Sequence, residues 1–103
     1  MQQDSLQKLI AEKDSFLNYF KSIFPVFHNS NIFFRDLQYA IQKYLVLKGD
    51  KVTYAQAEVY GRKFTKHLET ESILTAISSN TWRLNYELFK TGAPHTFEIK
   101  QTA

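Results

Sequence analysis

The spacing of the apolar residues changes once along this chain, and the change limits the folds that it can adopt. Between residues 6 and 68 most apolar side chains recur every three or four positions, which is the period of an amphipathic helix. Between residues 82 and 88 they alternate with polar side chains, which is the period of a half-buried strand. The sequence therefore predicts an α+β fold in which helices come first and strands follow.

Local signals divide the helical part into segments. Pro25 disfavours helix at the residue before it, so a first helix of about five turns is expected over residues 4–24. The polar joint at residues 28–31 offers N-cap side chains for a second helix, which would include Phe33 and Phe34. Lys48 and Gly49 are expected to end that helix, because Lys favours the negative end of the helix dipole and glycine tolerates left-handed backbone.

The third helix has the clearest predicted start. Thr53 and Gln56 have the spacing of a capping box, in which each side chain satisfies a backbone donor near the other. Gly61 costs roughly 1 kcal/mol relative to Ala inside a helix, so its presence indicates either a close approach to another helix or an unoptimised position, and we favour the close approach. The inner face of this helix is expected to consist of Ala57, Tyr60, Gly61, Phe64 and Leu68.

A β-hairpin is expected after the third helix. The apolar period shortens toward two at residues 73–77, residues 78–81 are a cluster of turn-forming side chains, and residues 82–88 alternate. We interpret Trp82 as the anchor of this hairpin against the core and not as a platform for base stacking, because its alternation partners are apolar.

Length and composition indicate a single domain. A chain of 103 residues that is 44% hydrophobic can build one core but not two. Gly92, Ala93 and Pro94 break the strand pattern, so we expect one domain over residues 1–91 and a C-terminal tail over residues 92–103. Within that tail, residues 96–100 have a short strand-like pattern whose state is left open.

Several classes of function lack their usual sequence signals. There is no cysteine, so a disulfide, a thiol nucleophile and a thiolate metal site are excluded. His28, His67 and His95 lie in separate segments without the close pairing of metal motifs, and no phosphate-binding glycine loop or nucleophile elbow is found. We therefore expect a protein that is not an enzyme and has no metal site, no cofactor and no small-molecule substrate.

Charge and hydropathy suggest a soluble protein. The net charge of +3 permits contact with nucleic acid but does not require it, and no basic block is present. No apolar run is long enough to span a bilayer, and no basic start is followed by an apolar region. We therefore expect a cytoplasmic protein that does not enter a membrane.

The order of these elements resembles a winged helix-turn-helix domain. A second helix ending at a glycine, an extended link through Lys51 and Val52, a capped third helix and a two-stranded wing follow one another over residues 31–89. The resemblance rests on this order and not on a signature string. The link over residues 48–53 is longer than the turn of the plain motif, which leaves the groove geometry open. The resemblance implies a three-helix winged-helix-like domain with a C-terminal β-hairpin, acting as a small regulator-like DNA-binding protein.

The same resemblance implies which side chains would contact double-stranded DNA. The third helix would lie in the major groove, and the wing would contact the backbone or the minor groove. Gln can read adenine and Arg can read guanine, while Lys and the polar groups of the turn would contact phosphates. The implied nucleic-acid-binding residues are Tyr54, Gln56, Arg62, Lys63, Lys66, Asn80 and Arg83, with Val59 in the same outward row and Ser79 and Thr81 in the turn.

The same helix face also has an ordinary structural interpretation. Glu58 and Arg62 are four residues apart, and Lys66 and Glu69 are three apart, so each couple could form a surface ion pair. The two carboxylates would also repel phosphates. Mixed charge of this kind is typical of a solvated helix face.

A second functional hypothesis is a protein–protein interaction or assembly module. Aromatic residues make up 16% of the chain, and they crowd the end of the first helix and the start of the second. A contiguous exposed set would form a homodimer or partner surface, whereas the ordinary alternative is one aromatic core. The implied partner-binding residues are Phe16, Tyr19, Phe20 and Phe24, with Phe27, Phe33 and Phe34 nearby.

Overall fold

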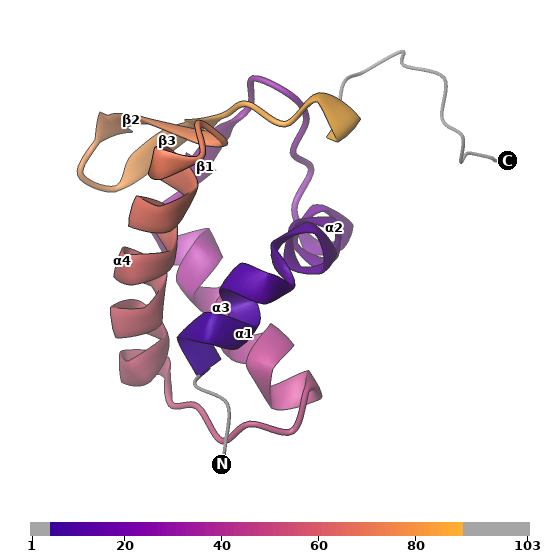
Figure 1. The fold of residues 1–103 in the computed structure, drawn as a ribbon, viewed down its shortest axis with the longest axis vertical. Helices are drawn as coiled ribbons and strands as arrows, with labels where there is room; N and C mark the ends of the chain where they lie inside the picture. The colour runs from indigo at the N-terminus through magenta and orange to yellow at the C-terminus, as the bar shows by residue number, and fades with distance from the viewer. Residues whose placement is uncertain (1–4, 90–103) are drawn as a thin grey trace, which may run out of the picture.

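The computed structural model describes residues 5–89, which form an α+β fold of four α-helices and a three-stranded antiparallel sheet (Figure 1). The expected tail over residues 92–103, with its strand-like stretch, lies outside the described residues. The helices are α1 (Ser5–Ala11), α2 (Lys13–Ile23), α3 (Phe34–Leu47) and α4 (Tyr54–Thr70). The strands are β1 (Asn31–Phe33), β2 (Leu74–Ser78) and β3 (Thr81–Leu84), and a 3-10 turn, η1 (Glu87–Phe89), follows them.

The sheet lies at one end of α4, α1 and α3 lie beside α4, and α2 packs against α3 (Figure 1). Its strand order is β1-β3-β2, so β3 is central. Ile32 of β1 and Ala76 of β2 both lie opposite Trp82 of β3, and the register shifts between Ala76 and Ser78. Neighbouring side chains of a strand point to opposite faces, so Trp82 and Leu84 face the core while Arg83 faces solvent.

The prediction of one first helix is wrong, because the chain turns at Glu12 and forms α1 and α2. The Tyr44 hydroxyl donates a hydrogen bond of 2.6 Å to Glu12 Oε1, and Lys48 Nζ lies 3.5 Å from the same oxygen. Tyr44 lies in the last turn of α3, and Lys48 directly follows that helix. The apolar spacing continues across the break because α1 and α2 both bury side chains in the same core.

The carboxylates of Asp50 and Glu12 hold α1 in place. Asp50 accepts hydrogen bonds of 2.9 Å from Ser5 Oγ and from Lys8 Nζ. The bond from Lys8 is the main reason that the pKa of Asp50 lies below its ordinary value, and the bond from Tyr44 likewise lowers the pKa of Glu12. Both carboxylates therefore stabilise the fold in their ionised form.

The segment between α2 and α3 also differs from the prediction. Residues 31–33 form β1 and α3 begins at Phe34, with Phe33 at its N-cap position and no side-chain cap. Ile32 is buried opposite Trp82, and the Phe34 amide donates a hydrogen bond of 2.9 Å to the Asn80 carbonyl oxygen. A strand of three residues is too short to display an alternating pattern, so only its pairing with β3 reveals it.

The last strand is shorter than predicted, since β3 ends at Leu84 and not at residue 88. The Asn85 amide donates to the Ile73 carbonyl oxygen at 2.7 Å, and the Tyr86 amide donates to His28 Nδ1 at 3.1 Å. The backbone amides after Leu84 therefore donate their hydrogen bonds to groups outside the sheet, and the chain continues into η1.

The predictions for α4 are confirmed. Thr53 and Gln56 form both hydrogen bonds of a capping box, and Gly49 has the left-handed φ of +95° that lets the chain leave α3. Gly61 is packed closely, because a Cβ atom there would lie 3.0 Å from Phe34 Cε1. Ala57, Gly61, Phe64 and Leu68 are buried, and Tyr60 is partly buried.

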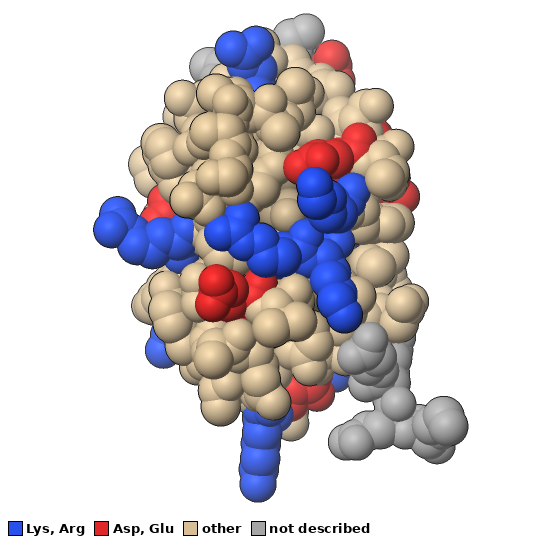
Figure 2. All heavy atoms as spheres, turned by 90° about the vertical axis from the view of Figure 1, so that its left-hand side faces the viewer, with Lys and Arg blue, Asp and Glu red and all other residues tan. Residues whose placement is uncertain are grey.

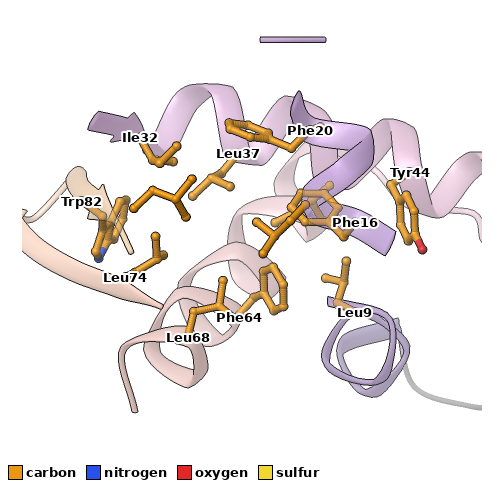
Figure 3. Close-up of a cluster of buried hydrophobic side chains, with 14 of the residues drawn as sticks. Leu9, Phe16, Phe20, Ile32, Leu37, Tyr44, Phe64, Leu68, Leu74 and Trp82 are labelled. Atoms are coloured by element: carbon orange, nitrogen blue, oxygen red, sulfur yellow. The ribbon is translucent and has the colours of Figure 1, made fainter. Parts of the chain in front are cut away.

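One aromatic core joins the helices to the sheet (Figure 3). The ring of Phe16 meets the rings of Tyr44 and Phe64 edge-on, with centroids 5.5 Å apart in each case. Trp82 lies at the opposite end of the cluster from Tyr44, and its ring centroid is 6.1 Å from that of Phe34. This core fixes α4 against the other helices and leaves its far face toward solvent.

Candidate nucleic-acid interface

Lys and Arg side chains gather on the face of the molecule that carries α4. Figure 2 shows them as a band across the middle of this face, with acidic side chains above and below the band. Lys63 and Lys66 are exposed on α4 and make no hydrogen bond or ion pair with another of residues 5–89. Val59 lies in the same outward row and is 52% exposed. The outward face of α4 therefore carries cations in its second half, whereas its first half exposes Gln56, Glu58 and Val59.

Arg62 has a different environment from its two lysine neighbours. Its Nη1 donates a hydrogen bond of 2.8 Å to the Ser79 carbonyl oxygen, and its Nη2 donates one of 2.6 Å to Asn80 Oδ1. The guanidinium carbon also lies 3.7 Å from the centroid of the Phe34 ring. Arg62 thus joins α4 to the turn between β2 and β3 while it covers an aromatic ring.

Asn80 connects three elements at this turn. Its side chain accepts from Arg62 of α4, its carbonyl oxygen accepts from the first amide of α3, and its amide donates to Ser78 Oγ at 3.3 Å. The position of the turn relative to α4 is therefore fixed by hydrogen bonds.

The other residues predicted to contact DNA differ in their exposure, their hydrogen bonds and the direction in which they point. Gln56 is exposed, but its Oε1 accepts the capping hydrogen bond of 2.9 Å from the Thr53 amide. Tyr54 is 45% exposed at the start of α4. Arg83 is exposed on the face of the sheet that points away from α4, because its neighbour Trp82 points toward Glu69 of α4. Arg83 therefore points away from Arg62, Lys63 and Lys66.

The two expected ion pairs on α4 are not formed. Among the ion pairs of the described residues, none joins Glu58 to Arg62 or Lys66 to Glu69. Glu69 Oε2 instead accepts a hydrogen bond of 2.7 Å from Trp82 Nε1. Trp82 is 3% exposed, so it anchors β3 against α4 and has no free face for base stacking.

Two hollows flank α4. One, of about 710 Å³, lies between α3, α4 and the β2–β3 turn and is lined in part by Phe33, Arg35, Tyr54 and Glu58. The other, of about 370 Å³, separates α4 from β2 and is lined in part by Lys66, Glu69, Ser78 and Ser79. Arg62 borders both hollows, since its side chain reaches from α4 to the turn.

No model of a known protein family matches the chain, and neither a curated protein nor a solved structure matches it.

The residues predicted to form a partner surface do not form an exposed patch. Phe16 and Phe20 are 0% and 1% exposed, so their expected exposure is wrong. Tyr19 and Phe24 are partly buried and pack against the core. The break at Glu12 explains the difference, because it folds both sides of the first helical segment onto the core.

Exposed rings occur in another place, near the start of α3 and the start of α4. Phe33 is 50% exposed, and it lines the larger hollow together with Tyr54. Tyr39 is 43% exposed, and it lines a third hollow, of about 340 Å³, also together with Tyr54. The signal for Tyr39 was available in the sequence, because Tyr39 falls between the buried positions Leu37 and Ala40 of α3. The sequence pattern places Phe33 in the second helix, so it does not predict the exposed position of this ring on β1.

Residues 5–89 lack two other features, a cluster of metal ligands and a helix that could span a membrane. No group of His, Asp or Glu side chains within this range could hold a metal ion. None of its helices is both long enough and apolar enough to cross a bilayer. The expectation that the protein is not an enzyme stays a prediction.

Proposed function

We propose that this protein is a small winged helix-turn-helix domain that binds double-stranded DNA with α4 and the β2–β3 turn. The order of α3, α4, β2 and β3, and the antiparallel pairing of the last two, support this assignment. In the proposal β2 and β3 are the wing, and α4 is the helix that faces the duplex.

The observation that carries the proposal is the pair of exposed cations on α4, beside a turn held by hydrogen bonds. Lys63 and Lys66 have no partner among the described residues, so their ammonium groups are available to phosphates. Arg62 fixes the turn next to them. The carboxylates near the band oppose this attraction, so we expect moderate affinity that weakens as salt is added.

The experiment is a titration of a short labelled duplex at low salt, followed by fluorescence anisotropy. The variant with both Lys63→Ala and Lys66→Ala should lose about tenfold or more in affinity, because two phosphate contacts are removed. Lys43→Ala is the matched control, since Lys43 is an exposed cation on α3. An equal loss of binding free energy per removed lysine in the two variants would attribute binding to net charge and would reject the role of α4.

A second candidate, assembly through aromatic side chains, is favoured by the exposure of Phe33, Tyr39 and Tyr54. Tyr54 lines a hollow with Phe33 and another with Tyr39, and exposed rings at such hollows are suited to a partner or a second copy of the chain. Light scattering over a range of concentrations tests this candidate. It predicts a mass above the monomer that Tyr39→Ala lowers, whereas Leu47→Ala, at an exposed position on the end of α3, leaves the mass unchanged.

A further inference from the structure

Gln56 and Arg62 of α4 are chemically suited to reading bases, and both are engaged within the protein. A glutamine that reads adenine uses its carbonyl oxygen and its amide nitrogen together. The Oε1 atom of Gln56 already accepts the hydrogen bond from the Thr53 backbone amide, and the Gln56 backbone amide completes the capping box by donating to Thr53 Oγ1. To read adenine, Gln56 would have to share this oxygen between the cap and the base or give up the cap.

Arg62 is engaged more completely. An arginine that reads guanine presents two donors in one plane to the edge of the base. Both terminal nitrogens of Arg62 donate to the β2–β3 turn, and the ring of Phe34 lies 3.7 Å from the guanidinium carbon. Releasing Arg62 would break two hydrogen bonds and would uncover the ring.

The rest of the outward row offers few groups that distinguish bases. Base contacts of a recognition helix come from its N-terminal residues, where α4 exposes Tyr54, Ala55 and Val59 besides Gln56. None of these three side chains offers a pair of hydrogen-bonding groups to the edge of a base. Glu58 could accept from cytosine, but it lines the hollow toward α3 together with Arg62. Lys63 and Lys66 lie in the second half of α4, where an ammonium group acts as a point charge toward phosphate.

The groove between α4 and β2 has the chemistry of a phosphate contact. Lys66 borders it on the helix side, and Ser78 and Ser79 border it on the strand side. Ser78 Oγ accepts from the Asn80 amide, which leaves the hydroxyl proton to donate to an anion. Glu69 also borders this groove, but Trp82 donates to its carboxylate.

We propose that the domain holds a duplex through its sugar–phosphate backbone alone, and that base sequence does not affect its affinity. This inference rests on the proposed function. Arg62 is a positioning residue in it, since it fixes the β2–β3 turn beside Lys66 and does not touch a base. Lys63, Lys66 and the serine hydroxyls of the turn supply the contacts.

The test is a panel of duplexes of equal length and different sequence, including one made only of A·T pairs and one made only of G·C pairs, measured with the full chain at one salt concentration. Affinities should agree within about threefold, because backbone contacts carry little sequence information. A duplex that binds more than about tenfold tighter than the others would overturn this inference and leave the proposed function standing. No binding to any duplex by the folded protein would overturn both.

Two variants separate positioning from base reading. Arg62→Ala should weaken binding to every duplex by the same factor, and Asn80→Ala should do so to a smaller extent. If Arg62 reads guanine, Arg62→Ala weakens binding only to duplexes that contain G·C pairs, and Asn80→Ala, which frees Arg62, strengthens binding to them. Circular dichroism confirms that each variant is folded, and Arg62→Lys replaces Arg62→Ala if the latter is not. Lysine keeps the charge but not the two-pronged geometry, so under our inference it also gives equal losses on every duplex.

Discussion

The Arg62 guanidinium and the side-chain amide of Asn80 are joined by a hydrogen bond of 2.6 Å, although the two residues lie 18 positions apart. This contact links the exposed side of α4 to the turn between β2 and β3. Its two partners are exposed, so it is open to solvent and its net contribution to stability is modest. Its structural consequence is larger, because it fixes the turn relative to the lysines of α4.

The first prediction concerns this contact. Arg62→Ala should lower the free energy of unfolding by about 1–2 kcal/mol, since it also uncovers Phe34, and Asn80→Ala should lower it by about 1 kcal/mol. The double variant should lose less than the sum of the two, with a coupling of about 0.5–1 kcal/mol. Urea unfolding of the four proteins measures the coupling, and strictly additive losses would show that the contact is absent in solution.

The second prediction concerns Gly61. Alanine usually stabilises a helix by about 1 kcal/mol relative to glycine, but here the added Cβ would lie 3.0 Å from Phe34 Cε1 and 3.1 Å from Phe34 Cζ. The ring has little room to move, because Arg62 covers it. We therefore expect Gly61→Ala to lower stability by about 1 kcal/mol net, measured by thermal unfolding.

The matched control for Gly61→Ala is the same substitution in a Phe34→Leu background. Leucine lacks the ring atoms that the new methyl group would meet, so the penalty should shrink or reverse there. A stabilising effect of Gly61→Ala in the native background would contradict the close packing described here.

The third prediction concerns pH. Lys8 lowers the pKa of Asp50, so the folded state favours the ionised carboxylate. A depressed carboxylate pKa gives stability that is present above the unfolded-state pKa of about 4 and is lost as the pH falls through the folded-state pKa. Asp50→Asn should therefore reduce stability by up to about 1 kcal/mol at neutral pH, and the difference from the native protein should narrow below about pH 4.

Urea unfolding at several pH values measures this difference. Asp36→Asn is a suitable control, because Asp36 makes no ion pair with another of the described residues. A gap for Asp50→Asn that stays constant from neutral to acid pH would contradict the assigned role of its charge.

The fourth prediction concerns the start of α4. Thr53→Ala removes the acceptor of the Gln56 amide and should lower stability by about 1 kcal/mol, whereas Thr53→Ser keeps the oxygen and should cost much less. Hydrogen exchange at the Gln56 amide should become faster in Thr53→Ala alone. Equal exchange rates in the two variants would indicate that the cap does not protect this amide.

The elements that the sequence predicts well are those specified by nearby residues. Thr53 and Gln56 are three positions apart, and Gly49 acts within one turn of the end of α3, so these signals are local. The break at Glu12 depends on Tyr44, which is 32 positions away, and β1 depends on its pairing with β3. No periodicity within residues 4–33 contains that information.

The residues of the candidate interface likewise fall into those that the sequence places correctly and those whose position depends on distant parts of the chain. Helical spacing correctly places Lys63 and Lys66 on the outward face of α4, because that face follows from the buried positions Ala57, Gly61 and Phe64. The contacts of Arg62 could not be predicted, since they require the position of the turn. The orientation of Arg83 away from α4 likewise follows only from the arrangement of the sheet.

The central claim is that α4 binds nucleic acid through Lys63 and Lys66, and the salt dependence of duplex affinity tests it most directly. The logarithm of the binding constant should fall linearly with the logarithm of the salt concentration, and each lysine-to-alanine substitution should reduce the slope by about one unit. Lys43→Ala should leave the slope unchanged. Affinity that does not vary with salt, or the same slope in the native protein and in the double lysine variant, would contradict the claim.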